Sequence, residues 1–125
     1  MLRECRRVLR SGGRIAGYVI HVASDLSSRD YSRAVELGPS EVGAREDPAR
    51  LHELAGFAEV RQVDTTDQWH ATTSSLIRVR DHHERGLRLA EGDDAFEEEQ
   101  AKKRGLVEGM TVGILRRCLV AGRVP

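Results

Sequence analysis

The apolar and polar positions of the chain follow two periods, one typical of helices and the other typical of strands. In residues 2–10 apolar side chains recur every three or four positions, which predicts a short amphipathic helix. The glycine pair Gly12 and Gly13 follows this segment and is expected to end the helix. Residues 14–22 are then almost continuously apolar and rich in β-branched side chains, a pattern typical of a strand buried on both faces.

The pattern is broken in residues 23–46, where Ser, Asp, Gly and Pro are frequent. Within this segment a short helix is predicted at residues 31–37. Asp30 is placed to cap its first turn and Gly38 to end it. The rest of the segment is expected to be irregular.

A second helix–strand unit follows the irregular segment. Asp47 precedes Pro48, and an N-cap residue followed by proline at the first helical position is a strong signal for the start of a helix. Gly56 is placed to end this helix, and residues 58–64 are predicted to form the next strand.

Two long helices are predicted before the last strand. Residues 67–90 are expected to form one of them and residues 94–113 the other, with a Glu-Gly-Asp break at 91–93. A final strand is predicted at 115–122, so helices and strands alternate and the fold class is α/β. The residues expected on the apolar face of the first long helix are Trp69, Leu76, Val79, Leu87 and Ala90.

Composition places the chain among globular proteins and narrows its partners. The 125 residues suffice for one domain, with 32% charged and 39% hydrophobic residues. The formal net charge is zero, which argues against nucleic-acid binding. Neither a bilayer-length apolar run nor a signal-peptide core is present in the sequence. We therefore expect no membrane association and a cytoplasmic location.

The cysteines and histidines do not form a metal-binding pattern. Cys5 and Cys118 lie far apart in the sequence and are expected to be small, buried or half-buried residues. His82 and His83 are adjacent on a helix and therefore make a poor ligand pair, and His52 stands alone. Because His83 falls on the predicted apolar face of its helix, we expect it to be a buried core histidine.

Three segments carry a resemblance to class I S-adenosylmethionine-dependent methyltransferases. "LRECRRVLRSGGRI" resembles the helix, glycine turn and fifth strand of that family, with Ser11 where proline is usual. "DPARLHELAGFAEVRQVD" resembles the next helix and the sixth strand, and "GILRRCLVAGRVP" resembles the seventh. The resemblance implies a partial Rossmann-like sheet of three strands in the order first–third–second, with the last strand antiparallel and helices flanking the sheet.

The resemblance also implies that residues 1–125 are the C-terminal portion of a methyltransferase domain. The glycine-rich turn that takes the cofactor in this family follows a strand, whereas residues 12–17 follow a helix and open a strand. We therefore expect no cofactor-binding residues here, with S-adenosylmethionine bound mainly by an N-terminal half that precedes Met1. Met1 would then be an internal methionine or the start of a truncated gene product.

Two functions follow as hypotheses. The intact protein would transfer a methyl group from S-adenosylmethionine to a small-molecule acceptor, and the isolated chain would lack cofactor binding. Alternatively, the chain is a non-catalytic α/β module for interaction or oligomerisation. In the family fold the strand 14–22 would be an exposed apolar sheet edge, and we expect it to pair with another copy or with a complementing half.

No catalytic residue can be assigned from the sequence, but four side chains are candidates for substrate binding. Ligands of open α/β sheets bind at the carboxyl ends of strands, where His21 lies as a possible base or hydrogen-bond donor. Tyr31 would belong to a lid or merely pack a surface loop. Trp69 would form a pocket wall or part of the core. His70 is its neighbour in the sequence.

Overall fold

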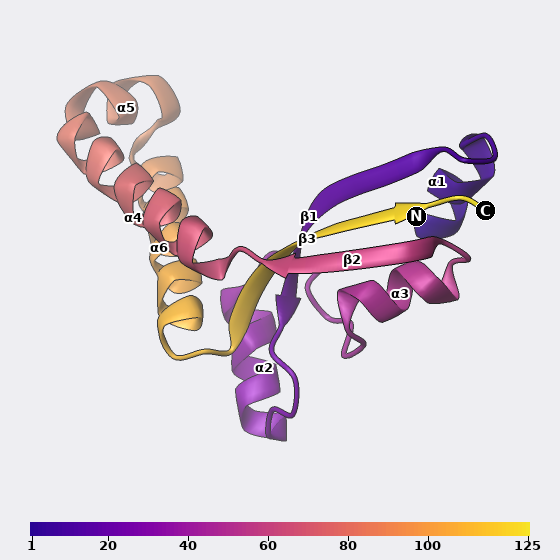
Figure 1. Cartoon of the computed structure of the whole chain (residues 1–125). Coiled ribbons are helices and arrows are strands. Elements are labelled where there is room, and N and C mark those ends of the chain that lie inside the picture. The colour runs from indigo at the N-terminus through magenta and orange to yellow at the C-terminus, as the bar shows by residue number, and fades with distance from the viewer.

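A computed structural model describes residues 1–125 as a three-stranded sheet with six helices (Figure 1). The strand order is β1–β3–β2, and both outer strands run antiparallel to β3. The predicted α/β class, strand order and antiparallel last strand are thus confirmed. The elements are α1 (Leu2–Val8), β1 (Arg14–Val22), α2 (Ser28–Leu37), α3 (Pro48–Leu54), β2 (Ala58–Asp64), α4 (Thr66–His82), α5 (Glu84–Glu91), α6 (Asp93–Thr111) and β3 (Leu115–Arg123).

The strand β3 is central in space although it is the last element in the sequence. It pairs with β1 over nine residues, from Val22 opposite Leu115 to Arg14 opposite Arg123. Its pairing with β2 is interrupted by a bulge near Ala58. The register is continued beyond the strands, because the Gly12 N–H donates to the carbonyl of Val124 at 2.9 Å.

The strand β1 is an exposed edge, as the resemblance to methyltransferases implied, whereas the burial on both faces expected from its apolar pattern is wrong. Tyr18 keeps 64% of its surface exposed, and Val22 is the one fully buried residue of the strand. The reason is that β1 has β3 as its single neighbour. One row of its backbone groups is therefore unpaired, and its side chains are flanked by those of another strand on one side only. The strand with the buried pattern is β3, whose Leu115 and Val120 are inaccessible to solvent.

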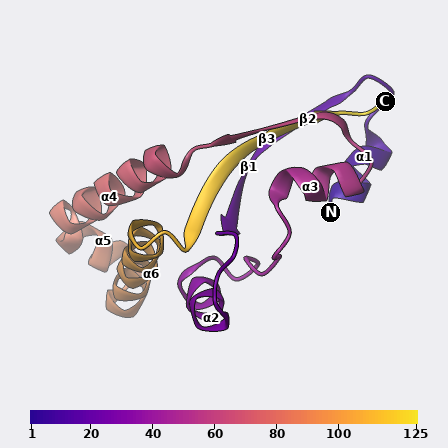
Figure 2. The same ribbon diagram turned by 60° about the horizontal axis from the view of Figure 1, so that its bottom comes forward.

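The hydrophobic core lies at the carboxyl end of β1, between the sheet and the helices α2 and α6. Figure 2 shows α1 and α3 beneath the end of the sheet that holds the chain termini, and α2 and α6 at its other end. On the α3 side, a Cβ atom at Gly122 would lie 3.2 Å from the side chain of Phe57, so β3 approaches closely there. The core cluster consists of Val22, Ala34, Val42, Trp69, Met110, Ile114 and Leu115.

The short helices confirm two of the predicted helix ends and correct a third. Asp47 caps α3, since its carboxylate accepts the backbone N–H of Ala49 at 2.9 Å. Gly38 follows the end of α2 as expected. The cap of α2 is Ser27 rather than Asp30, because the Ser27 hydroxyl accepts the Asp30 N–H at 3.1 Å and the helix begins three residues earlier.

The predicted helix 67–90 is in fact two helices, because the chain turns at His83 between α4 and α5. The predicted apolar face is also wrong, since Leu76 and Val79 are 44% and 54% exposed. His83 itself is exposed and not a core residue. The helices α4, α5 and α6 together form a projecting unit, the helical arm, seen at the left of Figure 1.

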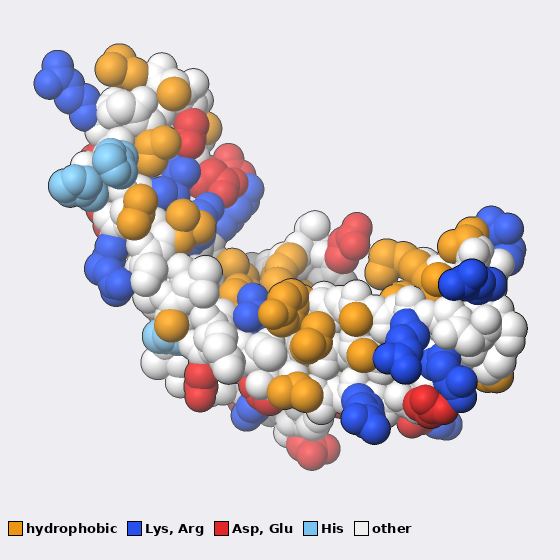
Figure 3. All heavy atoms as spheres, turned by 45° about the horizontal axis from the view of Figure 1, so that its top comes forward, with side chains coloured by type: hydrophobic (Ala, Val, Ile, Leu, Met, Phe, Trp, Pro, Cys, Tyr) orange, Lys and Arg blue, Asp and Glu red, His pale blue; other side chains and the backbone are white.

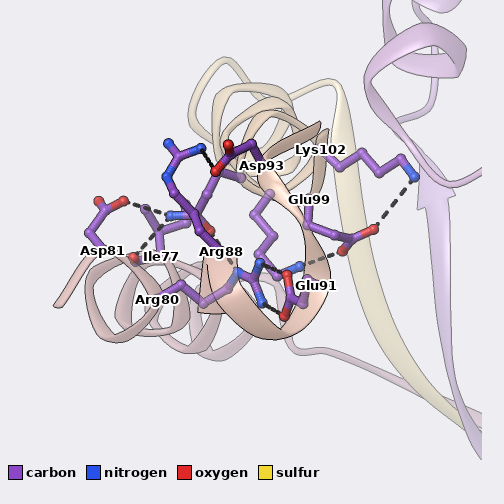
Figure 4. A network of polar contacts seen from close by, with 10 residues as sticks. Ile77, Arg80, Asp81, Arg88, Glu91, Asp93, Glu99 and Lys102 are labelled. Carbon is purple, nitrogen blue, oxygen red and sulfur yellow. Dashed lines mark hydrogen bonds and ion pairs between the residues drawn. The ribbon is translucent and has the colours of Figure 1, made fainter. Parts of the chain in front are cut away.

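The helical arm has a polar centre, which explains the misplaced apolar face. Gln100 of α6 is fully buried, and Figure 4 shows its partners Arg80 and Asp81 within the polar network of the arm. Its amide donates to Asp81 at 2.7 Å, and its carbonyl accepts from Arg80 Nε at 2.9 Å. Because α4 turns these polar side chains toward α6, its Leu76 and Val79 face outward.

An ion pair between Arg80 and Glu91 joins α4 to α5. Both terminal nitrogens of Arg80 donate to the carboxylate of Glu91, at 3.0 and 2.7 Å. This hydrogen-bonded ion pair lowers the pKa of Glu91. The guanidinium groups of Arg80 and Arg88 both lie over the ring of Phe96, at 5.2 and 4.5 Å from its centroid. Cation–π contacts and ion pairs therefore stabilise the packing of α4, α5 and α6 in the arm, whereas apolar packing stabilises the sheet.

Both cysteines are free thiols, as the sequence indicated. Cys118 is 1% exposed in the centre of the sheet, whereas Cys5 is partly exposed on α1. Burial raises the pKa of the Cys118 thiol to about 11, with smaller contributions from the charges of Asp47 and Asp64. None of the helices has the length and apolar character that a membrane span requires.

The contact between α6 and β3 can be tested at a glycine. A Cβ atom at Gly109 would lie 2.5 Å from Leu115 Cδ1, a side chain with no room to move. We expect Gly109→Ala to lower the free energy of unfolding by about 2 kcal/mol in urea titrations. The matched control is Gly105→Ala on the same helix, where the nearest atom is at 3.4 Å. This control should be neutral or stabilising by up to about 1 kcal/mol, and equal losses in both variants would contradict the packing argument.

Candidate functional site

A pocket of about 240 Å³ lies beside the carboxyl end of β1. Its walls come from β1, the segment 41–46, α3 and the first residues of the chain, and most of them are apolar. The polar side chains in its lining are His21, His52, Glu41 and Glu46. The end of β1 is the edge at which open α/β sheets bind ligands, so the pocket is in the predicted place.

Both imidazoles of this pocket are fixed by backbone carbonyls. His21 Nδ1 lies 3.0 Å from the carbonyl oxygen of Val22, and His52 Nδ1 lies 2.7 Å from that of Pro48. Since a carbonyl accepts only, the neutral imidazoles carry their protons on Nδ1, and each Nε2 is left as an acceptor. With two glutamates beside them, these side chains supply several hydrogen-bond acceptors, which suits an apolar ligand that carries N–H or O–H groups.

Tyr31 holds the segment 41–46 that forms one wall of this pocket. Its hydroxyl donates to the carbonyl of Gly43 at 2.5 Å, and the guanidinium of Arg45 lies 3.9 Å above its ring. A second hollow of about 300 Å³ lies on the other side of Tyr31. Asp25, in a left-handed conformation with φ of 59°, lines this hollow. Tyr31 therefore lines the second hollow and is hydrogen-bonded to Gly43, a wall residue of the first pocket.

Trp69 and His70 lie away from these hollows. Trp69 is 7% exposed and belongs to the core cluster, and His70 Nε2 lies 3.1 Å from the hydroxyl of Thr111 on α6. Of the four candidates, His21 lines the pocket directly and Tyr31 lines the second hollow, whereas Trp69 and His70 lie at the base of the helical arm. The substrate-binding roles of all four stay predictions.

Sequence reasoning did not select His52, Glu41, Glu46 or Arg45. The one signal for His52 is that it stands one helical turn after Pro48, a spacing that places its ring beside the Pro48 carbonyl. The other three lie in the irregular segment, which has no periodicity from which to infer a facing direction.

The glycine turn before β1 does not fit a cofactor loop. Gly12 donates its N–H to Val124, and Gly13 donates its N–H to Arg10 at 2.8 Å, so these backbone donors are already engaged. A phosphate- or carboxylate-binding turn needs its N–H groups free. The described chain also contains no group of three His, Cys, Asp or Glu side chains placed to hold a metal ion.

The hydrogen bond of Tyr31 can be tested by amide exchange. Tyr31→Phe removes the donor to Gly43, so we expect residues 41–46 to exchange their amide protons about fivefold faster, since such a bond contributes about 1 kcal/mol. Hydrogen–deuterium exchange with mass spectrometry measures this. Tyr18→Phe is the control, because no hydrogen bond of the Tyr18 hydroxyl is present. Unchanged exchange in Tyr31→Phe would show that the segment is held by other contacts.

Comparisons with known proteins find similarity in structure alone. No protein-family model and no curated protein sequence matches the chain. Among solved structures, phosphoethanolamine N-methyltransferase 2 from Haemonchus contortus, in complex with S-adenosylhomocysteine, matches 99% of the chain with a TM-score of 0.80 and 11% identity. A putative sarcosine dimethylglycine methyltransferase from Galdieria sulphuraria matches 98% with a TM-score of 0.83 and 14% identity.

A cyclopropane synthase from Mycobacterium tuberculosis matches 98% of the chain with a TM-score of 0.75 and 12% identity. The chain spans only 29% to 48% of the length of these proteins. The fold expected from the resemblance to methyltransferases is therefore found in solved structures of that class, and the match covers 98% to 99% of the chain. The chain has the fold of a portion of an S-adenosylmethionine-dependent methyltransferase.

Proposed function

We propose that the intact protein transfers a methyl group from S-adenosylmethionine to a small-molecule acceptor, and that this chain is its C-terminal, substrate-facing portion. The observation that carries the proposal is the match of 98% to 99% of the chain to methyltransferase structures of about two to three times its length. The pocket at the end of β1 supports it, because its histidine and glutamate side chains can accept a hydrogen bond from the N–H or O–H group of a methyl acceptor.

The chain's own contribution would be to bind and orient the acceptor. The apolar wall of the pocket would hold the body of the molecule and exclude water. His21 Nε2 would accept the proton that leaves the acceptor's nitrogen or oxygen, while the bond from Nδ1 to Val22 keeps the ring oriented. The cofactor supplies an already activated methyl group when bound, and the turn at Gly12 does not hold it.

Cofactor binding provides the test. The chain alone should show no binding of S-adenosylmethionine in calorimetry at cofactor concentrations up to about 1 mM, because the cofactor is expected to bind the other half. The chain expressed with the in-frame sequence that precedes Met1 should bind the cofactor and methylate small amines or alcohols. Tight binding by the chain alone, or the absence of a glycine-rich strand–turn–helix upstream, would contradict the proposal.

Within that active protein, His21→Gln should lower the rate of methyl transfer about 100-fold at neutral pH, if the ring acts as base. Labelled methyl transfer measures the rate. His82→Gln on the arm is the matched control and should leave the rate unchanged. A rate unaffected by His21→Gln would remove the proposed base.

A second candidate function, as an association module, is favoured by the free edge of β1. The strand has one hydrogen-bonded neighbour and exposes Tyr18, Gly17 and Ala16. Such an edge is a template for pairing with another strand. We propose that this edge takes a strand of a second copy or of the complementing half.

A charged side chain introduced on the edge of β1 distinguishes association through this strand from nonspecific aggregation. A side chain at Gly17 would meet no atom within 4 Å, so Gly17→Lys is tolerated by the fold but opposes strand pairing. We expect at least tenfold weaker self-association in sedimentation velocity. Gly86→Lys on α5, equally unobstructed, adds the same charge elsewhere and should have no effect. A wild-type chain that stays monomeric at high concentration would exclude pairing between copies.

A further inference from the structure

The end of the sheet opposite His21 carries a cluster of arginines around a hollow. This hollow has a volume of about 390 Å³ and is lined by Arg14 of β1, Arg61 of β2 and Arg123 of β3. Glu59 is the one acidic residue in its lining. Figure 3 shows basic side chains gathered at this end of the molecule, away from the helical arm.

The charges of the hollow are not balanced within the chain. Arg14 and Arg123 stand directly opposite one another on paired strands, an arrangement in which like charges repel. Glu59 forms an ion pair with Arg123, whereas neither Arg14 nor Arg61 has an acidic partner. Three guanidinium groups beside one carboxylate leave two positive charges facing the hollow.

Two further observations indicate that the fold holds Arg123 and Glu59 in specific positions at this hollow. The Nε atom of Arg123 is buried without a hydrogen-bond partner, and it is the one such side-chain atom in the molecule. Glu59 adopts a left-handed conformation, with φ of 52°, where the pairing of β2 shifts register before Arg61. Such a conformation is costly for a residue other than glycine, and the bulge brings the Glu59 carboxylate to Arg123.

We propose that this hollow binds a phosphate group, as a free ion or as a phosphate ester. A phosphate monoester carries a charge of about −1.5 to −2 at neutral pH, which matches the two unbalanced guanidinium charges. The planar fork of arginine donates two parallel hydrogen bonds to oxyanions of this kind. A bound phosphate would relieve the repulsion between Arg14 and Arg123 while Glu59 holds Arg123 in place. The proposal does not depend on methyl transfer.

The test is a titration of the ¹⁵N-labelled chain with inorganic phosphate and with glycerol 3-phosphate at constant ionic strength. The arginine Nε–H signals in NMR spectra report on the hollow directly. We expect saturable shifts of the Arg14, Arg61 and Arg123 signals. Whichever compound binds more tightly identifies the source, a free ion or an ester.

Matched variants separate a site from general attraction to positive charge. Both Arg14 and Arg61 are exposed, so the double variant R14Q/R61Q should fold and should weaken binding about tenfold or more. R3Q/R10Q on and beside α1 removes the same charge from exposed positions and should retain the affinity. The single variant R61Q provides a second reading if the double variant is destabilised. Shifts that do not saturate, or equal losses in R14Q/R61Q and R3Q/R10Q, would overturn the proposal.

Discussion

The antiparallel pairing of β3 with both outer strands is the interaction on which the rest of the structure depends. The strands β1 and β2 are not neighbours in the sheet, so β3 provides the hydrogen-bonded strand between the two helix–strand units of the chain. Leu115, the first residue of β3, is fully buried against the close approach of Gly109 on α6, which sets the position of the helical arm relative to the sheet. The end of β1 that lines the pocket is likewise held in place by β3, with His21 opposite Arg116 and Val22 opposite Leu115.

Local signals in the sequence predicted most of the elements. The Asp47–Pro48 start, the glycine ends and the three apolar runs gave the strands within a residue or two, because each signal acts through neighbouring backbone. The order of the strands came from the resemblance to methyltransferases and not from periodicity. The apolar pattern of β1 wrongly indicated burial on both faces, because the sequence of a strand alone does not reveal how many neighbours it has; its place at a sheet edge came from the resemblance.

The helical arm marks a second limit of periodicity. Its residues follow a helical repeat, yet the face of α4 that meets α6 contains Arg80 and Asp81, which are hydrogen-bonded to the buried Gln100 of α6. Hydrophobicity alone places such side chains in solvent, so the face predicted for α4 is correct at Trp69 and wrong at Leu76 and Val79. The candidate site shows the same division: His21 followed from its place at a strand end, whereas Glu41 and Glu46 needed the path of an irregular segment that only the coordinates give.

The late position of the central strand has a consequence for how the protein is made. When a ribosome has synthesised the chain through β2, neither outer strand yet has its β3 partner, and β1 and β2 share no hydrogen bonds. The strand β1 then stays unpaired with β3 until residues more than ninety positions later in the sequence have been synthesised. Translation speed through the helical arm, and the chaperones that bind extended apolar segments meanwhile, would thus govern the yield of native protein.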